Sequence, residues 1–155
     1  MKIVILHNIR SVYNVGAIFR TCDAVGIDCV VLSGHTPTPI DRFGRARADL
    51  HKAAVGAEQF VAWEKTDDVL GYIQEKKRTN FEIIALEQSK KSLDYKKINP
   101  RDDCVVVLGS ETDGVDPEIL DLADTVAEIP MRGKKESLNV SVATGVALYR
   151  LFDRN

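Results

Sequence analysis

The sequence predicts an α/β domain built on a mostly parallel sheet flanked by helices. Short apolar runs rich in β-branched residues alternate with helical patterns, and several of the runs are apolar throughout. Strands that are covered on both faces of a parallel sheet have this composition. The alternating order predicts right-handed crossovers and, with no repeat or linker, a single domain over residues 1–155.

Turn residues and helix-end signals divide the chain into elements. Five apolar runs are predicted strands: Ile3–Leu6, Cys29–Leu32, Phe60–Trp63, Ile83–Leu86 and Cys104–Leu108. Five helices are predicted at about residues 15–25, 46–55, 67–78, 117–123 and 139–153. Asn14 is expected to cap the first helix and Gly26 to close it, Thr66 to cap the third, and Pro117 to occupy a first helical position.

Composition excludes several classes of protein. The net charge of −2 argues against bulk electrostatic binding of nucleic acid, although local basic patches remain possible. Three cysteines without a CxxC pair favour neither disulfides nor zinc and predict a reducing cytoplasm. The first apolar run is too short for a signal peptide or membrane span. The three histidines lack metal-ligand spacing, so no metal is expected and surface or loop positions are predicted for them.

The segment GSETDGV, residues 109–115, follows a predicted buried strand, where parallel sheets bind ligands. It has no Walker A lysine, and no GxGxxG follows the first strand, so neither nucleotide fold is supported. Its glycines would let backbone approach a ligand closely, while Glu111 and Asp113 would repel phosphate but accept a cation or a sugar hydroxyl. Such a loop would suit a ligand that lacks phosphate and carries a positive charge. S-adenosylmethionine, with its sulfonium and ribose hydroxyls, is a ligand of this kind. The alternative is a polar turn whose acidic residues favour the next helix N-terminus.

Two further segments carry unusual patterns. Residues 8–26 place Asn8, Arg10 and Asn14 after the first strand and Arg20 within an otherwise apolar helix. Residues 128–151 run from a strand through a basic loop into a helix with two apolar stripes. The stripes are Val140, Ala143, Ala147 and Leu151, and Val142, Val146 and Tyr149. This helix is predicted to be buried on two sides, or else to be central in the core.

Together these segments resemble the SPOUT class of RNA methyltransferases, specifically the SpoU/TrmH branch that methylates ribose 2′-oxygens. The resemblance covers essentially the whole chain and rests on three motifs in order. They are Asn14 with Arg20, Leu108–Glu111 with Gly114, and Ile129–Met131 with Ser137–Ser141. The RNA-binding domain that many relatives carry at the N-terminus is not expected in this chain, so the resemblance leaves open whether the substrate is tRNA or rRNA.

The resemblance implies a deep trefoil knot in the C-terminal part and a homodimer whose active site borrows residues from both chains. It implies S-adenosylmethionine as the cofactor, an RNA substrate and no metal. Cofactor-binding positions carried over from the family are Leu86, Gly109, Ile129 and Leu138 through their backbone, with Ser137 alongside. The matching functional polar set is Asn14, Arg20, Glu111, Ser137 and Asn139.

Each polar residue has an alternative structural role. Arg20 matches a residue proposed in the family to deprotonate the ribose hydroxyl, but a guanidinium that stays protonated is better suited to stabilise a developing alkoxide. It could instead pair with Asp23, although Gly16 is expected to leave room beside it for a substrate phosphate. Asn14, Ser137 and Asn139 could act as helix caps. For Glu111 three contacts stay open: the cofactor, the RNA, or Arg20 of the partner subunit.

Arg10, Arg42, Arg45 and Arg47 are candidate RNA-binding residues. The stretch that holds Arg42, Arg45 and Arg47 is the candidate to follow the RNA backbone, or it is a solvated turn and helix start. Two rival functions stay open. One is a catalytically silent RNA-binding dimer of the same fold. The other is a guanine base methyltransferase, for which Glu136 is the candidate base.

Overall fold

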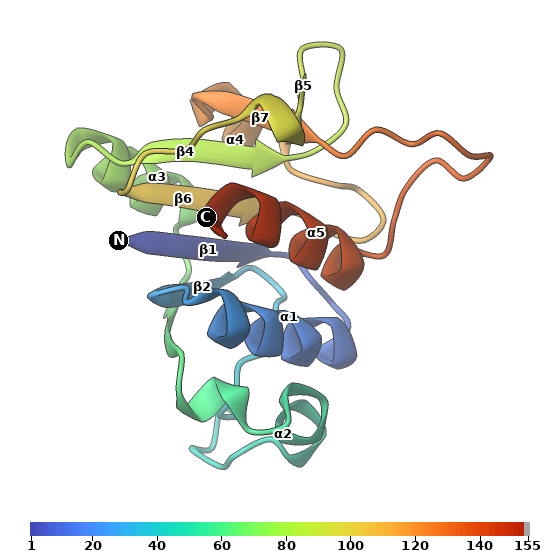
Figure 1. The fold of residues 1–155 in the computed structure, drawn as a ribbon. Helices are drawn as coiled ribbons and strands as arrows, with labels where there is room; N and C mark the ends of the chain where they lie inside the picture. Colours follow the sequence, from blue (N-terminus) through green and yellow to red (C-terminus); the bar gives the residue numbers. More distant parts are fainter. Residues whose placement is uncertain (154–155) are drawn as a thin grey trace.

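A computed structural model describes residues 1–153 and contains a parallel sheet of seven strands in the order β3-β2-β1-β6-β4-β7-β5 (Figure 1). The strands are β1 (Lys2–His7), β2 (Cys29–Ser33), β3 (Ala62–Thr66), β4 (Glu82–Leu86), β5 (Leu93–Asp94), β6 (Cys104–Leu108) and β7 (Thr125–Glu128). The first strand is central, since Ile5 is paired with Val31 of β2 and with Val107 of β6. The predicted parallel α/β architecture is confirmed.

Helices cover both faces of this sheet. They are α1 (Val12–Val25), α2 (Ala48–Ala54), α3 (Val69–Arg78), α4 (Pro117–Leu122) and α5 (Val140–Phe152), with 3-10 turns η1 (Ala57–Gln59) and η2 (Tyr95–Lys97). Side chains alternate along the strands, so Val4 and Leu6 pack with α1, α2 and α5, whereas Ile3 and Ile5 pack with α3 and α4. The two resulting cores place α1 beside α5 on one face (Figure 1).

Several predicted element ends are wrong, each for a local reason. The third strand begins at Ala62 rather than Phe60, because η1 precedes it and leaves Phe60 78% exposed. The first helix begins at Val12, since Ser11 and not Asn14 is its cap: Ser11 Oγ accepts from the Asn14 N–H at 3.3 Å. Asp68 and not Thr66 caps α3. The strand β5 was not predicted.

Other predicted helix ends are confirmed. Gly26 closes α1 with a φ of 76°, a conformation that only glycine adopts at little cost. Pro117 begins α4, and Asn139 caps α5 by accepting from the N–H groups of Ser141 and Val142. The strand expected before the basic loop is β7, which ends at Glu128.

His7 contradicts the prediction that all histidines lie on the surface or in loops. It ends β1 and is 8% exposed. Its Nδ1 lies 2.8 Å from Ser33 Oγ, and its Nε2 lies 3.0 Å from Asp116 Oδ2. A buried polar ring needs such partners, and here they join the ends of β1 and β2 to the start of α4. His35 and His51 are exposed, as predicted.

Among residues 1–153, no helix combines the length and the apolar character that a membrane crossing requires.

Candidate active site

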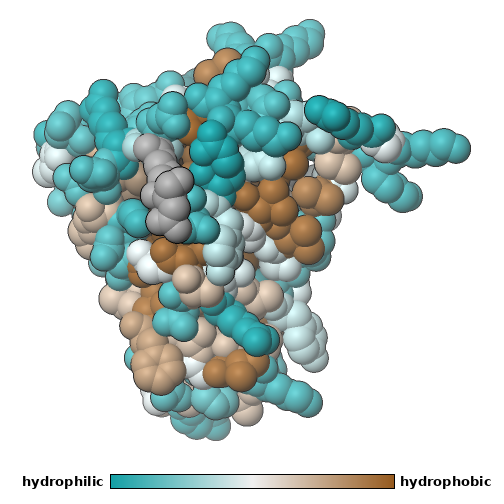
Figure 2. Space-filling view, viewed as in Figure 1, coloured by the Kyte–Doolittle hydropathy of each residue, from teal (hydrophilic) through white to brown (hydrophobic). Residues whose placement is uncertain are grey.

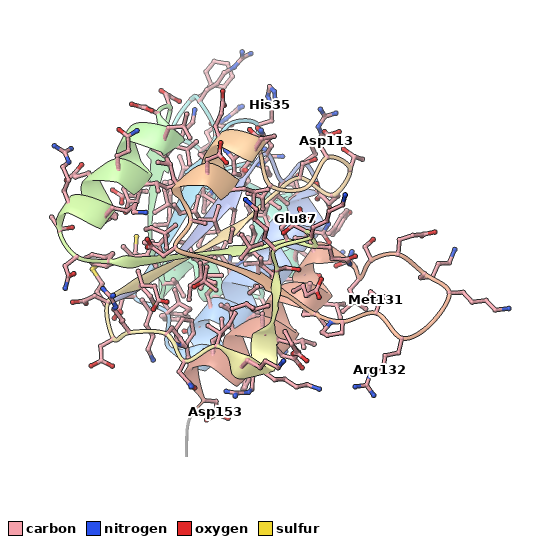
Figure 3. The ribbon with its side chains drawn as sticks, turned by 90° about the horizontal axis from the view of Figure 1, so that it is seen from above. His35, Glu87, Asp113, Met131, Arg132 and Asp153 are labelled. Carbon is pink, nitrogen blue, oxygen red and sulfur yellow. The ribbon has the colours of Figure 1, made fainter. Side chains whose placement is uncertain are left out.

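A cavity of about 500 Å³ lies at the carboxyl ends of β4, β6 and β7. Its volume is in the range of small-molecule sites, which extend from about 300 to 1,000 Å³. All five predicted cofactor-binding residues line it: Leu86, Gly109, Ile129, Ser137 and Leu138. Viewed from above, Glu87 lies between Asp113 and Met131, and Met131 lies at the base of the projecting basic loop (Figure 3). Segments far apart in sequence therefore converge here.

The loop after β6 is closed by its own backbone. Ser110 and Gly114 exchange two N–H···O=C hydrogen bonds of 3.0 Å. A Cβ on Gly109 would overlap the Gly114 carbonyl group, and a Cβ on Gly114, whose φ is 73°, would overlap the Glu87 carboxylate. The prediction assigned both glycines to ligand approach. The structure shows that the loop itself already requires them.

Glu87 is a site residue that the sequence did not single out. Its Oε2 accepts from the Val115 N–H at 2.8 Å, which ties the end of β4 to the loop after β6. The end of a predicted parallel strand is where such sheets bind ligands, yet no motif marked this glutamate. A carboxylate directly after a predicted buried strand was the only available signal.

Glu111 binds the segment that leads into α1. Its carboxylate accepts from the N–H groups of Arg10 (3.1 Å) and Ser11 (3.3 Å) and from Asn14 Nδ2 (3.0 Å). Partial burial disfavours the charged form, but these hydrogen bonds outweigh it and hold the pKa of the Glu111 carboxyl below its ordinary value of 4.5. Within its own chain, Glu111 therefore holds the start of α1 in place, a role that the sequence did not predict.

Asn14 links Glu111 to the last helix. Its Oδ1 accepts from Asn139 Nδ2 at 3.2 Å, while Asn139 Oδ1 accepts from the Ser141 N–H at 2.9 Å. Because Ser11 caps α1, the Asn14 side chain is available for this bridge. The expected capping role of Asn14 is thus wrong, whereas Asn139 both caps α5 and joins the polar chain Glu111–Asn14–Asn139.

Arg20 is separated from this polar chain. It is exposed, does not line the cavity, and has no hydrogen bond or ion pair, to Asp23 or otherwise, among the described residues. Six residues beyond Asn14, it lies about 9 Å further along the α1 axis and on another side of the helix. Gly16 leaves no space for a phosphate, since a Cβ there would lie 2.5 Å from the Cβ of Ala53. That glycine allows α1 and α2 to pack closely.

The candidate RNA-contacting arginines lie in two places. Arg10 is exposed and its backbone N–H is bound to Glu111, which lines the cavity. Arg42, Arg45 and Arg47 lie between β2 and α2. Two of these are already paired, Arg45 with Asp41 at 2.9 Å and Arg47 with Asp49 at 3.0 Å. The geometry does not bring this group to the cavity.

The basic loop between β7 and α5 extends beyond the body of the molecule, and Arg132 points away from the cavity (Figures 1 and 3). Its return is fixed by Gln88 Nε2, which donates to the Glu136 carbonyl at 2.7 Å. Ser137 and Leu138 line the cavity, but Glu136 does not and is exposed. In residues 1–153, no group of three or more histidine, cysteine or acidic side chains is placed to hold a metal ion.

The two apolar stripes of α5 have different surroundings. Ala147 and Leu151 are buried against the core, with Val140 and Ala143 partly buried. Val142, Tyr149 and Val146 are 51%, 47% and 37% exposed. Figure 2 shows hydrophobic side chains gathered on the surface over α5. One face of the predicted doubly buried helix is therefore uncovered in a single chain.

Comparisons with known proteins agree with this geometry. Residues 1–149 match the family model described as the SpoU rRNA methylase family. The chain is 37% identical to a tRNA (guanosine(18)-2′-O)-methyltransferase of Aquifex aeolicus, over 95% of this chain and 66% of that protein. It is 32% identical to the enzyme of the same name from Thermus thermophilus, over 94% and 71%.

Solved structures give the same result. The crystal structure of an A. aeolicus TrmH/SpoU tRNA modifying enzyme superposes with a TM-score of 0.83 at 35% identity, over 96% of this chain and 72% of that one. An AdoMet-bound rRNA methyltransferase from Sinorhizobium meliloti superposes with a TM-score of 0.86 at 27% identity, over 96% and 54%. The chain thus spans between about half and three quarters of these relatives.

Proposed function

The chain belongs to the SpoU rRNA methylase family, the SpoU/TrmH group of RNA methyltransferases, and we propose that it transfers a methyl group from S-adenosylmethionine to a ribose 2′-oxygen of tRNA or rRNA. One observation carries the proposal. Segments 8–14, 109–115 and 137–139 are joined by the Glu111–Asn14–Asn139 chain beside a single cavity. The proposed domain organisation is a single methyltransferase domain in each chain.

The cavity has the chemistry that the cofactor needs. Its lining includes the carboxylates of Glu87, Glu111, Asp113 and Glu128, which favour a sulfonium and ribose hydroxyls over phosphate. Backbone groups of Leu86, Gly109, Ile129 and Leu138 can match the donors and acceptors of an adenine edge, with Ser137 beside them. When bound, S-adenosylmethionine supplies an electrophilic methyl group.

The polar residues then orient the ribose. Glu111 fixes the backbone of Arg10 and Ser11, so the entrance to the cavity is held in place before RNA arrives. Asn139 and Ser137 lie where α5 begins and can position the nucleotide. Holding the reacting oxygen in place removes much of the entropic cost of the reaction. A guanidinium stabilises negative charge developing on that oxygen.

That guanidinium is proposed to come from a second chain. Arg20 is exposed and lies away from the cavity of its own chain. The exposed stripe Val142, Val146 and Tyr149 provides an apolar surface that a homodimer would cover. In the proposed dimer, Arg20 of the partner subunit completes each site.

Mixing two inactive variants tests this arrangement. Arg20→Ala and Asn139→Ala are each expected to lose methyl transfer as homodimers. If Arg20 acts across the interface, a refolded mixture regains activity, because one site of each heterodimer has both native residues. A mixture that stays inactive while heterodimers form would show that Arg20 acts within its own chain or not at all.

The activity itself is tested with purified protein, methyl-labelled cofactor and unfractionated tRNA or rRNA. Label transfer followed by nucleoside mass spectrometry is expected to give a 2′-O-methylated nucleoside. A methylated base would instead support the guanine methyltransferase alternative, although the exposed Glu136 lies outside the cavity lining. Absence of both transfer and calorimetric cofactor binding would favour the silent RNA-binding dimer.

The proposed trefoil knot involves the segments that surround the cavity. Its support is the path of the chain: β7 follows β6 but lies between β4 and β5, and α5 then returns to pack on α1. A circular permutant opened between Lys90 and Lys91 would cut the loop through which the chain is threaded. Such a permutant is expected to refold faster than the native order, and equal refolding rates would contradict threading.

The proposed compartment is the cytoplasm. Cys22, Cys29 and Cys104 are free and buried. Burial raises the pKa of the Cys29 and Cys104 thiols to about 11, so these thiols are protonated and unreactive at neutral pH. Reduced, structural cysteines are typical of that compartment.

A further inference from the structure

Residues 39–47, between β2 and α2, form a closed hairpin. The Arg47 N–H donates to the Pro39 carbonyl at 2.9 Å, and the Asp41 N–H donates to the Arg45 carbonyl at 2.8 Å. Gly44 makes the tight turn with a φ of 78°. The segment is therefore an ordered loop with a defined tip.

The Asp41 side chain fixes that tip. Its Oδ1 accepts from the N–H groups of Phe43 (2.8 Å) and Arg45 (3.0 Å), and its Oδ2 accepts from Arg45 Nε (2.9 Å). The hydrogen bond from the Arg45 backbone is the main reason that the pKa of Asp41 lies below its ordinary value. Phe43 is thus held at the end of the hairpin before any ligand arrives.

Phe43 is 66% exposed and has two guanidinium groups against its ring. The Arg42 guanidinium carbon lies 4.8 Å from the ring centroid and that of Arg45 lies 5.1 Å from it. Phe60 is more exposed, at 78%, yet within the described chain no cation lies over its ring. The exposure of an aromatic ring is therefore not enough to explain the two guanidinium groups beside Phe43.

A shallow cavity adjoins this ring. Arg42, Phe43, Arg47 and Lys65 line it together with the polar loop residue Thr38. Aromatic rings and guanidinium planes stack on unpaired nucleobases, and the same arginines bind phosphate. This combination suits an unpaired nucleotide better than an apolar peptide, which would meet several charged groups.

The hairpin lies at the same edge of the sheet as the cofactor cavity. It follows the carboxyl end of β2, and the strands β2 and β6 are two positions, or about 10 Å, apart in the sheet. Asn8 Oδ1 accepts from the His35 N–H at 3.0 Å, and His7 contacts Asp116, so the two loops are connected through the end of β1. His35 and Asp113 lie on the same side of the molecule in Figure 3.

We propose that Phe43, with Arg42 and Arg45, forms a subsite that stacks an unpaired nucleobase of the RNA at a distance from the methylated ribose. The proposal rests on the proposed function, because the RNA must also reach the cavity. Stacking tolerates any base, so this subsite selects for unpaired structure rather than for sequence.

The test compares oligoadenylate with an abasic oligonucleotide of equal length, which keeps the phosphates but lacks bases. Phe43→Leu preserves apolar volume and removes the aromatic face. It is expected to weaken oligoadenylate binding by about 5- to 100-fold and to leave abasic binding and its salt dependence unchanged. Phe43→Trp is expected to retain the affinity and to show fluorescence quenching by the bound bases.

Phe60→Leu is the matched control, since Phe60 is exposed but has no cation over its ring in residues 1–153. It is expected to bind both oligonucleotides like the wild type. A Phe43→Leu variant that keeps the wild-type preference for oligoadenylate would overturn the subsite. Wild-type protein that binds both oligonucleotides equally would also overturn it and would point to a protein-binding surface.

Methyl transfer and calorimetric cofactor binding, measured on the same preparations, separate the two proposals. If the wild type transfers methyl groups and Phe43→Leu binds oligoadenylate like the wild type, the subsite is contradicted and the proposed function stands. If the wild type neither transfers methyl groups nor binds the cofactor, but its preference for oligoadenylate is lost in Phe43→Leu, the proposed function is contradicted and the subsite is supported.

Discussion

The cofactor cavity and the hairpin of residues 39–47 lie at the same edge of the sheet but are built in opposite ways. Hydrogen bonds at the cavity join residues far apart in sequence, 97 positions for Asn14 with Glu111 and 125 for Asn139 with Asn14. Those of Asp41 in the hairpin join residues two to four positions apart. The cavity therefore depends on the whole fold, whereas the hairpin can change without disturbing it.

The largest expected effect follows from the closed loop at the cavity. Gly109→Ala would place a methyl group inside the Gly114 backbone, where no side chain can move away. We expect it to lower the free energy of unfolding by about 1–3 kcal/mol or more and to abolish cofactor binding. Urea unfolding at fixed protein concentration and calorimetry measure the two effects.

Gly133→Ala is the control for that substitution. Among residues 1–153, no atom beyond Gly133 and its two chain neighbours lies within 4 Å of a Cβ built on Gly133. Its free energy of unfolding is expected to stay within about 0.5 kcal/mol of the wild type. Equal stability of the two variants would mean that the loop after β6 relaxes to accept a side chain and is not held closed by the Ser110–Gly114 hydrogen bonds.

A smaller effect is expected from the polar chain. Glu111→Ala removes the acceptor for three N–H groups and should cost about 1–2 kcal/mol, comparable to the loss of a helix cap. The effects of Glu111→Ala and Asn14→Ala on the free energy of unfolding should depart from additivity by about 0.5 kcal/mol or more in the double variant, since the two side chains are in contact. The effects of Glu111→Ala and Asp41→Ala on the free energy of unfolding should be additive. Coupling between them would contradict the independence of the hairpin from the cavity.

Acid titration tests the hydrogen bonds that Glu111 accepts. Because the folded pKa of Glu111 lies below 4.5, its contribution to stability is fully present above that pH and is lost as pH falls through the folded pKa. We expect the amide signals of Arg10 and Ser11 to shift in an NMR titration below about pH 4.5. Glu111→Gln should remove the shifts, and signals that titrate unchanged in this variant would assign them to another group.

The smallest effect on folding is expected in the hairpin. Arg42→Ala should change the free energy of unfolding by no more than about 0.5 kcal/mol, because the ring that its guanidinium contacts is itself exposed. If it binds a phosphate, the salt dependence of RNA affinity should fall by about one unit of slope. An unchanged slope would exclude Arg42 from phosphate binding.

The architecture could be predicted because its signal is local. Apolar runs such as Cys104–Leu108 are buried on both faces, and this composition indicates a parallel strand without knowledge of its neighbours. The two-residue strand β5 has no such signal, since Leu93 and Asp94 become a strand only by pairing with β7.

The candidate site was predictable only in part. The resemblance named residues that do line the cavity, yet it could not reveal Glu87 or the burial of His7, because their roles arise from partners 28 and 109 positions away. The sequence does not separate a capping from a bridging role for Asn14, because an asparagine side chain makes the same hydrogen bonds in both. Ser11, three residues earlier, decided between them.

The bond between Glu111 and the segment before α1 also sets an order of events during synthesis. A nascent chain that has emerged only through β4 carries Asn14 without Glu111 or Asn139, and β1 still lacks its neighbour β6. Domains generally acquire their structure as the ribosome delivers them. Incomplete polypeptides of this protein would therefore have no assembled site in which to hold a reactive sulfonium.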